Sequence, residues 1–350
     1  MKNIRITIFL LFISAGLFSQ NTLTYRNNAL LPGDSSSFRE IQFVDPGNAG
    51  PNQIWDFSKI EYTGKNLVSQ MQPPSALKTA GVDQYNLLLS DAGYDYFMNT
   101  GETFLEERGY VNKQKKMTMS YSDPLLKMKY PFSYGDQFSD PFTGVAFFNE
   151  NYRIDFGGNY TAAADAYGTL ILPDMVIKNT LRVKSVKNGL QINMCGSVEV
   201  NITKYFWYAQ GFRYPVMTIS IVENRYGGKA PEITKTAYVN TGQQHDNGAI
   251  AGTNNSNPQV DKSDFSVIVF PNPFKEKLTY NYFLRKQLPV SIEIYDMSGK
   301  YNARLLKNQV QTEGLHTGEL DGMTNGLTPG VYYIRFTFDK QVIINKVVKI

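Results

Sequence analysis

The sequence predicts an all-β protein in which a large antiparallel, sandwich-type domain precedes a small β-sandwich. Tyr, Phe, Val, Ile and Thr recur in short runs separated by Gly, Asn, Asp and Pro, the residues typical of strands and tight turns. The runs repeat every ~8–12 residues, a spacing typical of antiparallel sandwiches and barrels. No segment has the hydrophobic period of a helix. With 350 residues, 42% of them hydrophobic and 19% charged, the chain can bury the cores of two or three domains.

The first element is an N-terminal segment with the pattern of a cleaved signal peptide, residues 1–20. Lys2 and Arg5 supply positive charge, Ile6–Ile13 is almost continuously apolar, and small or polar residues follow up to Gln20. The apolar stretch is shorter than the ~20 residues of a membrane-spanning helix, and an N-terminal membrane anchor is the alternative interpretation. No later segment reaches ~18 consecutive apolar residues. We therefore expect an exported protein with no transmembrane segment in the mature chain.

Residues 21–240 form the large domain of this prediction. Its strand candidates are Asn86–Leu89, Tyr94–Met98, Thr103–Glu107, Met117–Tyr121, Leu125–Tyr130, Val145–Phe148, Tyr152–Phe156, Thr169–Leu172, Val198–Ile202, Tyr205–Tyr208, Val216–Val222 and Ile233–Val239. Turn signals separate them at Asn99–Gly101, Gly135-Asp136, Gly157-Gly158 and Gly227-Gly228. These patterns leave open whether the domain is one unit or two.

The sharpest local prediction is a β-hairpin whose two-residue turn is Asn188-Gly189. An Asn-Gly pair accommodates the positive φ that a type I′ turn requires at both central positions. Alternation along the two strands then places five apolar side chains on one face: Leu181, Val183, Leu190, Ile192 and Met194. The lone Cys195 follows on the same strand, where we expect a buried and unreactive thiol.

A polar segment, residues 241–263, separates the large domain from the C-terminal unit. It contains only four apolar side chains, and the rest are mostly Gly, Asn, Gln, Ser, Thr and Asp. Such a composition buries too little surface to offset the entropy of ordering. The segment is therefore predicted to be a flexible linker, with His245 as a solvated side chain within it.

Residues 264–350 are predicted to form a small Ig-like β-sandwich of six or seven strands. The strand candidates are Asp264–Phe270, Lys277–Phe283, Val290–Tyr295, Tyr301–Leu306, Val331–Phe338 and Gln341–Lys349. Pro271 and Pro273 remove backbone donors and restrict φ, so they must end the first strand. Further turns are expected at Ser298-Gly299 and at Asp339-Lys340.

Four motifs of this C-terminal unit carry a family resemblance. "FPNPFKEKLTYNY", "VSIEIYDMSGK", "GLTPGVYYIRF" and the closing "INKVVKI" resemble the type A C-terminal sorting domain of the type IX (Por) secretion system of Bacteroidota. The matching positions are Pro271, Asn272, Pro273, Phe274, Tyr295, Asp296, Gly299, Leu327, Gly330, Val331, Tyr332, Lys346, Val347 and Lys349. His316 falls where such tails often carry Gly-x-His, which implies a structural role. The segment "HTGELDGMTNGLTPG" is longer than the usual link before the Gly-Val-Tyr strand.

The resemblance implies a route of export. The signal peptide takes such a chain to the periplasm, and an outer-membrane type IX translocon then recognises the folded tail. A sortase-like peptidase removes the tail, and the cargo is either attached to surface lipopolysaccharide or released. The expected location is therefore secreted or at the outer-membrane surface. Residues 21–240 are then the cargo, and stretches of them resemble secreted Bacteroidota proteins of unassigned activity.

Residue counts and missing motifs exclude several kinds of catalytic or metal centre. With two His and one Cys, the chain cannot build a His-rich or Cys-rich zinc site, an iron–sulfur cluster or a disulfide framework. No Gly-x-Ser-x-Gly, phosphate-loop, dinucleotide-binding, His-Glu-x-x-His or EF-hand motif occurs. The net charge is +2 in residues 1–20, −1 in 21–262 and +3 in 263–350, so no block has the basic excess of a nucleic-acid-binding protein. We expect no cofactor and no metal.

Carboxylates remain available for a hydrolase. A glycosidase needs two acidic side chains ~5–9.5 Å apart, and residues 21–262 contain 23 acidic side chains, of which no pair stands out. Glu106 and Glu107 are neighbours in a predicted strand, so they point to opposite faces. A non-enzymatic binding or structural protein is therefore the leading expectation. A secreted carbohydrate-active hydrolase is the alternative, and a component of a larger surface assembly is a third.

Two loops of the large domain carry a speculative ligand site. The segments are "DPGNAGPNQIWDFS", which begins at Asp45, and "ADAYGTLILPD", and the site residues are Trp55, Asp56, Asp165, Tyr167 and Asp174. Carboxylates in such loops can bind Ca²⁺, and Trp55 or Tyr167 can stack on a sugar, so a polysaccharide is the expected ligand. The alternative, which we favour, is a tight structural turn with an aromatic side chain in the core. The same choice applies to Trp207 in "YFWYAQGFRYP".

Overall fold

The structure is a computed structural model that describes residues 22–74, 82, 84–112, 114, 116–173, 175–194, 196–241, 265–270, 272–323 and 325–350. The predicted signal peptide, Cys195 and the predicted linker apart from residue 241 lie outside the described residues. Strands dominate the described chain, and one short helix, α1 (Tyr25–Asn28), precedes them. The prediction of an all-β protein with antiparallel sheets is confirmed.

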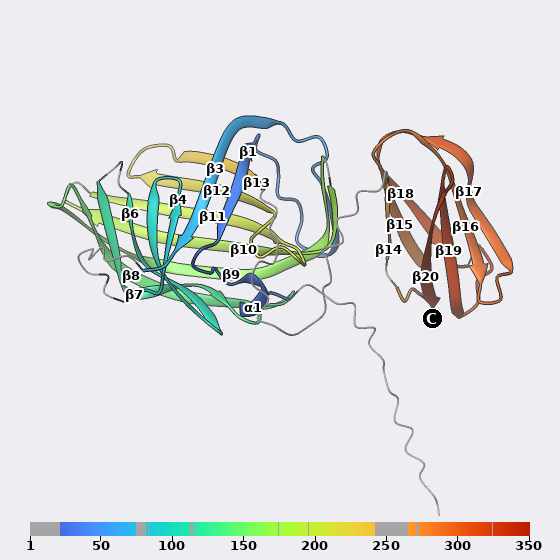
Figure 1. Ribbon diagram of the computed structural model, residues 1–350, viewed down its shortest axis with the longest axis horizontal. Helices are drawn as coiled ribbons and strands as arrows, with labels where there is room; N and C mark the ends of the chain where they lie inside the picture. The colour runs from blue at the N-terminus through green and yellow to red at the C-terminus, as the bar shows by residue number, and fades with distance from the viewer. Residues whose placement is uncertain are drawn as a thin grey trace, which may run out of the picture.

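One large sheet contains every described strand between residues 35 and 240. Its strands are β1 (Ser35–Ile41), β2 (Gly50–Asp56), β3 (Tyr62–Gln72), β4 (Leu87–Asp91), β5 (Tyr94–Gly101), β6 (Phe104–Asn112), β7 (Met117–Lys129), β8 (Gln137–Phe148), β9 (Tyr152–Leu172), β10 (Met175–Asn193), β11 (Gly196–Tyr208), β12 (Met217–Tyr226) and β13 (Glu232–Asn240). They are ordered β10-β11-β12-β13-β1-β3-β4-β5-β6-β7-β8-β9-β2, and β10 also pairs with β9. The β9–β10 pairing closes twelve of these strands into an antiparallel ring (Figure 1). The remaining strand, β2, lies outside the ring and pairs only with β9, in parallel.

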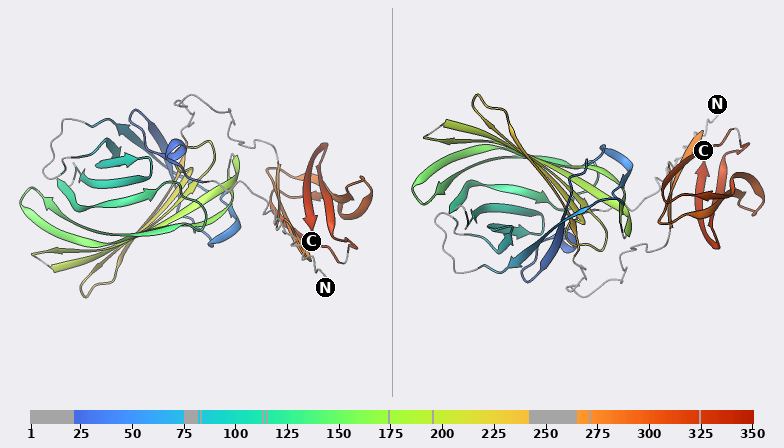
Figure 2. Two further views of the ribbon diagram at one scale, coloured as in Figure 1. Left: turned by 90° about the horizontal axis from the view of Figure 1, so that it is seen from below. Right: turned by 90° about the horizontal axis from the view of Figure 1, so that it is seen from above.

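The ring is flattened into two layers. Figure 2 shows the teal strands β4–β7 in one layer and the green-to-yellow strands β9–β12 in the other. The inward faces bury a core that includes Tyr121, Phe142, Phe156, Leu181 and Val183.

The N-terminal segment closes one end of the ring interior. The backbone of Leu23 exchanges hydrogen bonds of 2.8 and 2.9 Å with Phe132, and Leu23 is fully buried. Leu30 and Tyr214 pack against inward-facing side chains at the ends of β3, β4 and β5. The Tyr214 hydroxyl donates to Asp34 at 2.6 Å. Residues 22–34 and 209–216 therefore contact each other across this end of the ring.

A second core lies on the outer face of the ring, where the segment containing β2 covers β9 to β13. Trp55 and Phe57 pack edge-on against Trp207 of β11, with ring centroids 5.8 and 6.0 Å apart. All three side chains are buried, and Trp207 is fully so. The aromatic residues of this region therefore fill a core and do not form an exposed stacking face.

A β-bulge at Asp165 lets β9 contribute to both cores. Ala164 pairs with Val183 and Ala166 pairs with Arg182, so β9 carries one extra residue between these pairs. Since side chains alternate along a strand, the extra residue moves the following even-numbered positions from the inner to the outer face. Ala164 accordingly belongs to the inner core and Ala166 to the outer core.

The predicted hairpin turn at Asn188-Gly189 is wrong, and so is the predicted turn at Gly157-Gly158. Both dipeptides lie inside long strands, β10 and β9, and the β10–β11 pairing closes between Asn193 and Gly196. A Cβ atom at Gly158 would lie 2.0 Å from the carbonyl oxygen of Asn188. These glycines therefore permit close approach of two strands, which is the other common use of glycine in a sheet.

The continuous course of β10 changes which side chains share a face. Leu181 and Val183 are at most 1% exposed, whereas Leu190, Ile192 and Met194 are 40, 51 and 95% exposed. A hairpin reverses direction and would put all five on one face, but an uninterrupted strand puts odd and even positions on opposite faces. The predicted apolar face is therefore wrong for its last three residues.

Several predicted strands are parts of longer ones. β7, β9 and β11 each join two of the predicted strands, and the sequence pattern did not reveal β1, β2 or β3. Because all these strands belong to the same sheet, the region between residues 35 and 240 is one sheet and not two separate sandwiches.

The C-terminal unit is a sandwich of two sheets around one core. The first sheet contains β14 (Phe265–Phe270), β15 (Lys277–Leu284) and β18 (Gly314–Asp321), and the second contains β17 (Tyr301–Gln311), β16 (Leu288–Asp296), β19 (Gly330–Phe338) and β20 (Gln341–Lys349), each in that order. The six predicted strands and the turns at Ser298-Gly299 and Asp339-Lys340 are confirmed. The seventh strand, β18, contains the first part of the unusually long link.

The sandwich touches the large sheet at a small apolar patch. Phe283 of β15 points away from its own core and packs against Ile171 and Val176, and all three are at most 4% exposed. Beside this patch, Nη1 of Arg285 donates to the carbonyl oxygen of Pro173 at 3.0 Å. This contact explains why both faces of the last part of β15 are buried.

Candidate functional site

The proline-containing motif of the C-terminal unit fastens the last strand. Nδ2 of Asn272 donates to the carbonyl oxygen of Lys346, and the amide of Val348 donates to Oδ1 of Asn272, both at 2.8 Å. The backbone of Phe274 bonds to Val348 and Ile350 at 2.9 Å each, and its ring is 1% exposed. Side-chain and backbone groups of this motif therefore hold β20 in place. We call these contacts of Asn272 and Phe274 the terminal-strand clamp.

A second matching motif forms the turn between β16 and β17. The Asp296 carboxylate accepts hydrogen bonds from the amide and hydroxyl of Ser298 at 2.8 and 2.6 Å and from the amide of Lys300 at 3.0 Å. The bond from the Ser298 hydroxyl lowers the pKa of Asp296 most. Gly299 has φ +80°, which favours glycine at that position. The Tyr295 hydroxyl donates to Glu293 at 2.9 Å.

The remaining matching residues differ in their burial. Leu327, Tyr332, Val347 and Lys349 are buried, Gly330 and Val331 are half-buried, Pro273 and Lys346 are exposed, and Pro271 lies outside the described residues. The ammonium group of Lys349 donates to the carbonyl oxygen of Lys275 at 2.6 Å. The His316 ring stacks on Tyr282 at 4.9 Å, as expected for a structural role.

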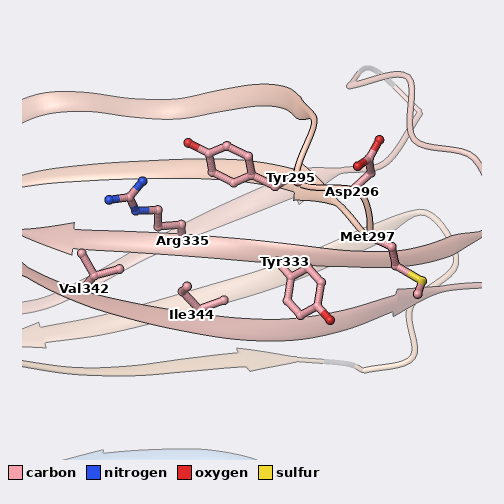
Figure 3. Close-up of a pocket in the computed structure, with 8 residues that line it drawn as sticks. Tyr295, Asp296, Met297, Tyr333, Arg335, Val342 and Ile344 are labelled. Atoms are coloured by element: carbon pink, nitrogen blue, oxygen red, sulfur yellow. The ribbon is translucent and has the colours of Figure 1, made fainter.

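The outer face of the four-stranded sheet carries an open groove, which we call the tail groove. It has a volume of about 480 Å³ and is lined by Tyr295, Asp296, Met297, Gly299, Tyr333, Arg335, Val342 and Ile344 (Figure 3). Met297, Val342 and Ile344 are 71, 43 and 60% exposed. Clustered apolar side chains left in solvent mark interaction surfaces.

The inner face of the large ring carries charged side chains that we call the interior charge cluster. Its members come from five strands: Asp91 (β4), Glu107 (β6), Lys127 (β7), Lys187 (β10) and Lys204 (β11). The Glu107 carboxylate lies 3.3 Å from Nζ of Lys127 and accepts a hydrogen bond from the Tyr121 hydroxyl at 3.2 Å. Nζ of Lys187 donates to the same hydroxyl at 2.6 Å. Strands of both layers thus bring their charges together inside the ring.

Burial and mutual attraction set the charge states of this cluster. Burial by itself raises the pKa of Glu107, but attraction to Lys127 and Lys187 outweighs it, and the pKa falls below its ordinary value. Burial lowers the pKa of Lys187 to about 8 against the attraction of Glu107. Burial and repulsion from Lys127 lower the pKa of Lys204. Two carboxylates, Glu107 and Asp91, therefore face three lysines.

Asp91 and Lys204 complete the cluster on its other side. Asp91 accepts a hydrogen bond from the Ser69 hydroxyl at 3.1 Å, and burial raises its pKa against the opposing effects of Ser69 and Lys204. Within the described ranges, the ammonium group of Lys204 has no hydrogen bond or ion pair. Glu107 and Asp91 attract this ammonium group without a hydrogen bond to it among the described residues, so its three N–H groups remain available to a ligand.

Tyrosine rings line the wall beside these charges. The ring centroids of Tyr94, Tyr96 and Tyr110 lie 5.6, 5.5 and 5.7 Å apart in the three pairs, and all three residues are half-buried. Burial, and then the charge of Glu107, raise the pKa values of Tyr96 and Tyr110 above their ordinary value. Both hydroxyls therefore stay neutral near pH 7 and are able to donate hydrogen bonds.

Two residues of the speculative ligand site, Trp55 and Asp165, are brought together by Arg182, which the sequence analysis did not single out. Nε and Nη2 of Arg182 donate to the two carboxylate oxygens of Asp165 at 2.9 and 2.8 Å, and Nη1 donates to the carbonyl oxygens of Pro46 and Gly47. The guanidinium group lies 5.6 Å from the Trp55 ring. Arg182 is 1% and Trp55 3% exposed, so Arg182 and Asp165 satisfy one another beside the Trp55 ring in the outer core.

The other residues of that site lie elsewhere. Asp56 is exposed and accepts two hydrogen bonds from Ser58 at 3.0 and 2.6 Å. Tyr167 packs with the inner core, and Asp174 lies outside the described residues. Asp45 accepts a hydrogen bond from the amide of Gly47 at 2.8 Å, which forms a tight turn. Trp55, Asp56 and Tyr167 therefore do not converge.

The described part of the chain has neither a group of metal ligands nor a membrane-spanning helix. There, no three or more His, Cys, Asp or Glu side chains are grouped so that they could hold a metal ion. No helix among the described residues has the length and apolar character to cross a membrane. Glu106 and Glu107 do point to opposite faces, since Glu106 pairs with Arg108 while Glu107 lies inside the ring.

The wrong turn hid one member of the interior charge cluster, Lys187. A hairpin at Asn188-Gly189 places Lys187 beside the turn, where a lysine is expected to be solvated. In the continuous β10, Lys187 has the same parity as the buried Leu181 and Val183, and it therefore points inward. Parity reveals this lysine only once the strand is known to continue past Gly189.

Comparison with known proteins bears on the C-terminal unit. Residues 268–350 match the family model described as secretion system C-terminal sorting domain. A search of curated proteins found no match to the chain. The matched range contains the terminal-strand clamp, the turn at Asp296 and the tail groove. Residues 268–350 are therefore a C-terminal sorting domain of the type IX (Por) secretion system, and the chain that carries it is a cargo of that system.

Proposed function

We propose that a signal peptide, residues 1–20, takes the protein to the periplasm and that the type IX translocon exports it by recognising residues 264–350. The match of residues 268–350 and the charged, then apolar pattern of residues 1–20 support this route. Residues 21–240 are the cargo, and residues 241–263 link it to the tail. A sortase-like peptidase removes the tail, which leaves the cargo attached to the cell surface or released.

The tail groove is the surface proposed to contact the translocon. Its exposed apolar side chains Met297, Val342 and Ile344 give a partner apolar area to bury, and Asp296 and Arg335 offer one charge of each sign at its margin. Val342 and Ile344 belong to β20, the strand that the terminal-strand clamp holds. Three of the family's matching residues, Tyr295, Asp296 and Gly299, line the groove. Asn272 and Phe274 lie outside it and hold the strand that contributes Val342 and Ile344.

An export assay with matched variants tests this role. We expect Ile344→Ser to lower the amount of protein at the cell surface and in the medium and to raise the periplasmic amount, because it removes apolar contact area from the groove. Val310→Ser is the control, since Val310 is 58% exposed on the same sheet outside the groove. Equal export of the two variants would contradict the groove as the contact. Unchanged surface display after deletion of Gln341–Ile350 would contradict the sorting role itself.

The cargo is proposed to be a non-enzymatic binding protein, and the interior charge cluster is the observation that carries this proposal. The transition state of glycoside hydrolysis develops positive charge on the sugar, which three neighbouring lysines oppose. Protonation of a leaving group requires a carboxylic acid with a raised pKa, whereas the pKa of Glu107 is lowered. A half-enclosed, positively charged and tyrosine-lined interior suits the retention of a ligand.

A secreted carbohydrate-active hydrolase is the second candidate, and one observation favours it. The pKa of Asp91 is raised while that of Glu107 is lowered, and carboxylates shifted in opposite directions are typical of acid and base pairs. Incubation of the protein with a polysaccharide panel decides between the candidates. Release of reducing ends that is lost in Asp91→Asn establishes the hydrolase. Binding on a glycan array without hydrolysis supports the binding protein, and neither activity leaves a structural role.

A further inference from the structure

We propose that the interior of the large ring binds a small organic carboxylate, whose charged group is held by Lys204 and Lys187 and whose remainder lies against the tyrosine wall. This inference rests on the proposed function of the cargo as a binding protein, and it names the class of ligand. An aromatic acid and a sugar acid both have a carboxylate that the lysines can bind and a ring that can lie against the tyrosines.

The available positive charge of the interior lies at Lys204. Lys127 is engaged by Glu107 at 3.3 Å, and Lys187 donates one hydrogen bond, to Tyr121, out of the three that an ammonium group can make. Lys204 has no hydrogen bond or ion pair with the residues that the structure describes. An incoming carboxylate therefore gains charge-assisted hydrogen bonds without displacing an existing ion pair.

The charge balance of the cluster selects an anion over a cation. Three lysines face two carboxylates, Glu107 and Asp91, so the cluster has an excess of basic side chains. A cationic ligand would meet an excess of like charge in a partly desolvated interior, where repulsion is stronger than in water. A bound carboxylate instead supplies the counter-charge that the cluster lacks.

The tyrosine wall supplies contacts for the rest of the ligand. Tyr94, Tyr96 and Tyr110 form a packed group of rings, and rings of this kind offer flat apolar faces with a polar edge. The Tyr96 hydroxyl has no hydrogen-bond partner in the described ranges. The charges of Glu107 and Asp91 act on this hydroxyl, so it lies near the cluster and is a further donor for a carboxylate oxygen.

The inward-facing side chains of the proposed site are open to a small molecule. Lys127 keeps 29% of its side-chain surface accessible although it lies inside the ring, and Lys204 and the three tyrosines are also half-buried. Residues 22–34 and 209–216 pack across one end of the ring. We therefore test the proposal with small carboxylates.

Calorimetric titration of the full-length protein tests the inference with two carboxylates and their neutral counterparts. The probes are benzoate with benzamide, and galacturonate with galactose, at pH 7. We expect at least one acid to bind with 1:1 stoichiometry and its neutral counterpart to bind at least tenfold more weakly. Lys204→Met should raise the Kd of that acid by about 10- to 100-fold, the effect of losing one charge-assisted hydrogen bond. Lys204→Arg should keep most of the affinity because it keeps the charge.

Lys184→Met is the matched control. Lys184 lies on the neighbouring β10 strand but on the outer face, with its ammonium group over the Tyr205 ring. Equal effects of Lys204→Met and Lys184→Met, equal binding of acid and neutral probe, or no binding of either acid would overturn the inference. None of these three results contradicts the proposed function as a binding protein, which the glycan array tests separately. Polysaccharide hydrolysis that is lost in Asp91→Asn would overturn the proposed function, whether or not the acids bind. Binding of benzoate alone or of galacturonate alone identifies the source of the carboxylate.

Discussion

Replacing Asp165 by Asn tests whether Arg182 organises the outer core of the cargo. The substitution preserves side-chain size but removes the charge that pairs with Arg182 through hydrogen bonds of 2.9 and 2.8 Å. Arg182 is 1% exposed, so water cannot replace the lost partner. Breaking a buried ion pair by removing one partner costs about 3–5 kcal/mol. We expect a loss of about 3 kcal/mol in the free energy of unfolding, because Asn still accepts one hydrogen bond.

Tryptophan fluorescence measures this effect where it occurs. The chain has two tryptophans, Trp55 and Trp207, and their ring centroids lie 5.8 Å apart in the outer core. For a unit of this size the expected loss corresponds to about 6–12 °C in the midpoint of thermal unfolding. Asp56→Asn makes the same chemical change at an exposed side chain and should shift stability by less than about 0.5 kcal/mol. A midpoint for Asp165→Asn equal to that of Asp56→Asn would refute the reasoning.

Three further predictions concern the strands, the tail and the interior. Gly158→Ala should destabilise the cargo by about 1–3 kcal/mol or more in urea unfolding, because its Cβ would meet the Asn188 carbonyl oxygen at 2.0 Å. Gly227→Ala is the control and should have little effect, because no atom lies within 4 Å of its Cβ. Similar losses of stability in the two variants would refute the close approach of the strands at Gly158. Asn272→Ala removes two hydrogen bonds to β20 and should lower tail stability by about 1–3 kcal/mol, and hydrogen exchange of β20 should accelerate relative to β16. With a folded-state pKa of about 8 for Lys187 and about 10.4 when unfolded, this lysine binds more protons in the unfolded chain between these values, so its own contribution to stability should rise from pH 8 to pH 10. The unfolding free energy of the wild-type protein minus that of Lys187→Met should therefore increase between these two pH values in urea unfolding, and an unchanged difference would contradict burial of this lysine.

Local sequence signals were reliable where a turn depends on its own residues. Ser298-Gly299 and Asp339-Lys340 separate antiparallel strands, and Gly299 and Asp339 have positive φ values of 80° and 51°. In both cases the strands on either side are neighbours in the sheet, so no distant partner competes with the turn. The prediction at Asn188-Gly189 failed because the same dipeptide also suits a strand whose neighbour passes unusually close.

The candidate sites also differ in whether local sequence signals reveal them. The motif residues of the tail were found from their order and spacing, and the structure explains their roles through local contacts such as those of Asn272 with β20. The interior charge cluster combines residues from five strands between Asp91 and Lys204. No local pattern indicates which lysine of a strand faces inward, because one misplaced turn or one bulge, such as that at Asp165, reverses the parity of all that follows.

The sequence by itself determined the all-β composition and the small C-terminal sandwich with its sorting motifs, because strand propensity and turn chemistry act over a few residues. Only the tertiary structure decided that β1 and β3 to β13 close into one ring and that three lysines share the interior of that ring. It also decided that Trp55 and Trp207 meet in a core around Arg182. Those features depend on pairing between segments up to two hundred residues apart. Such pairing is selected by the packing of the whole sheet.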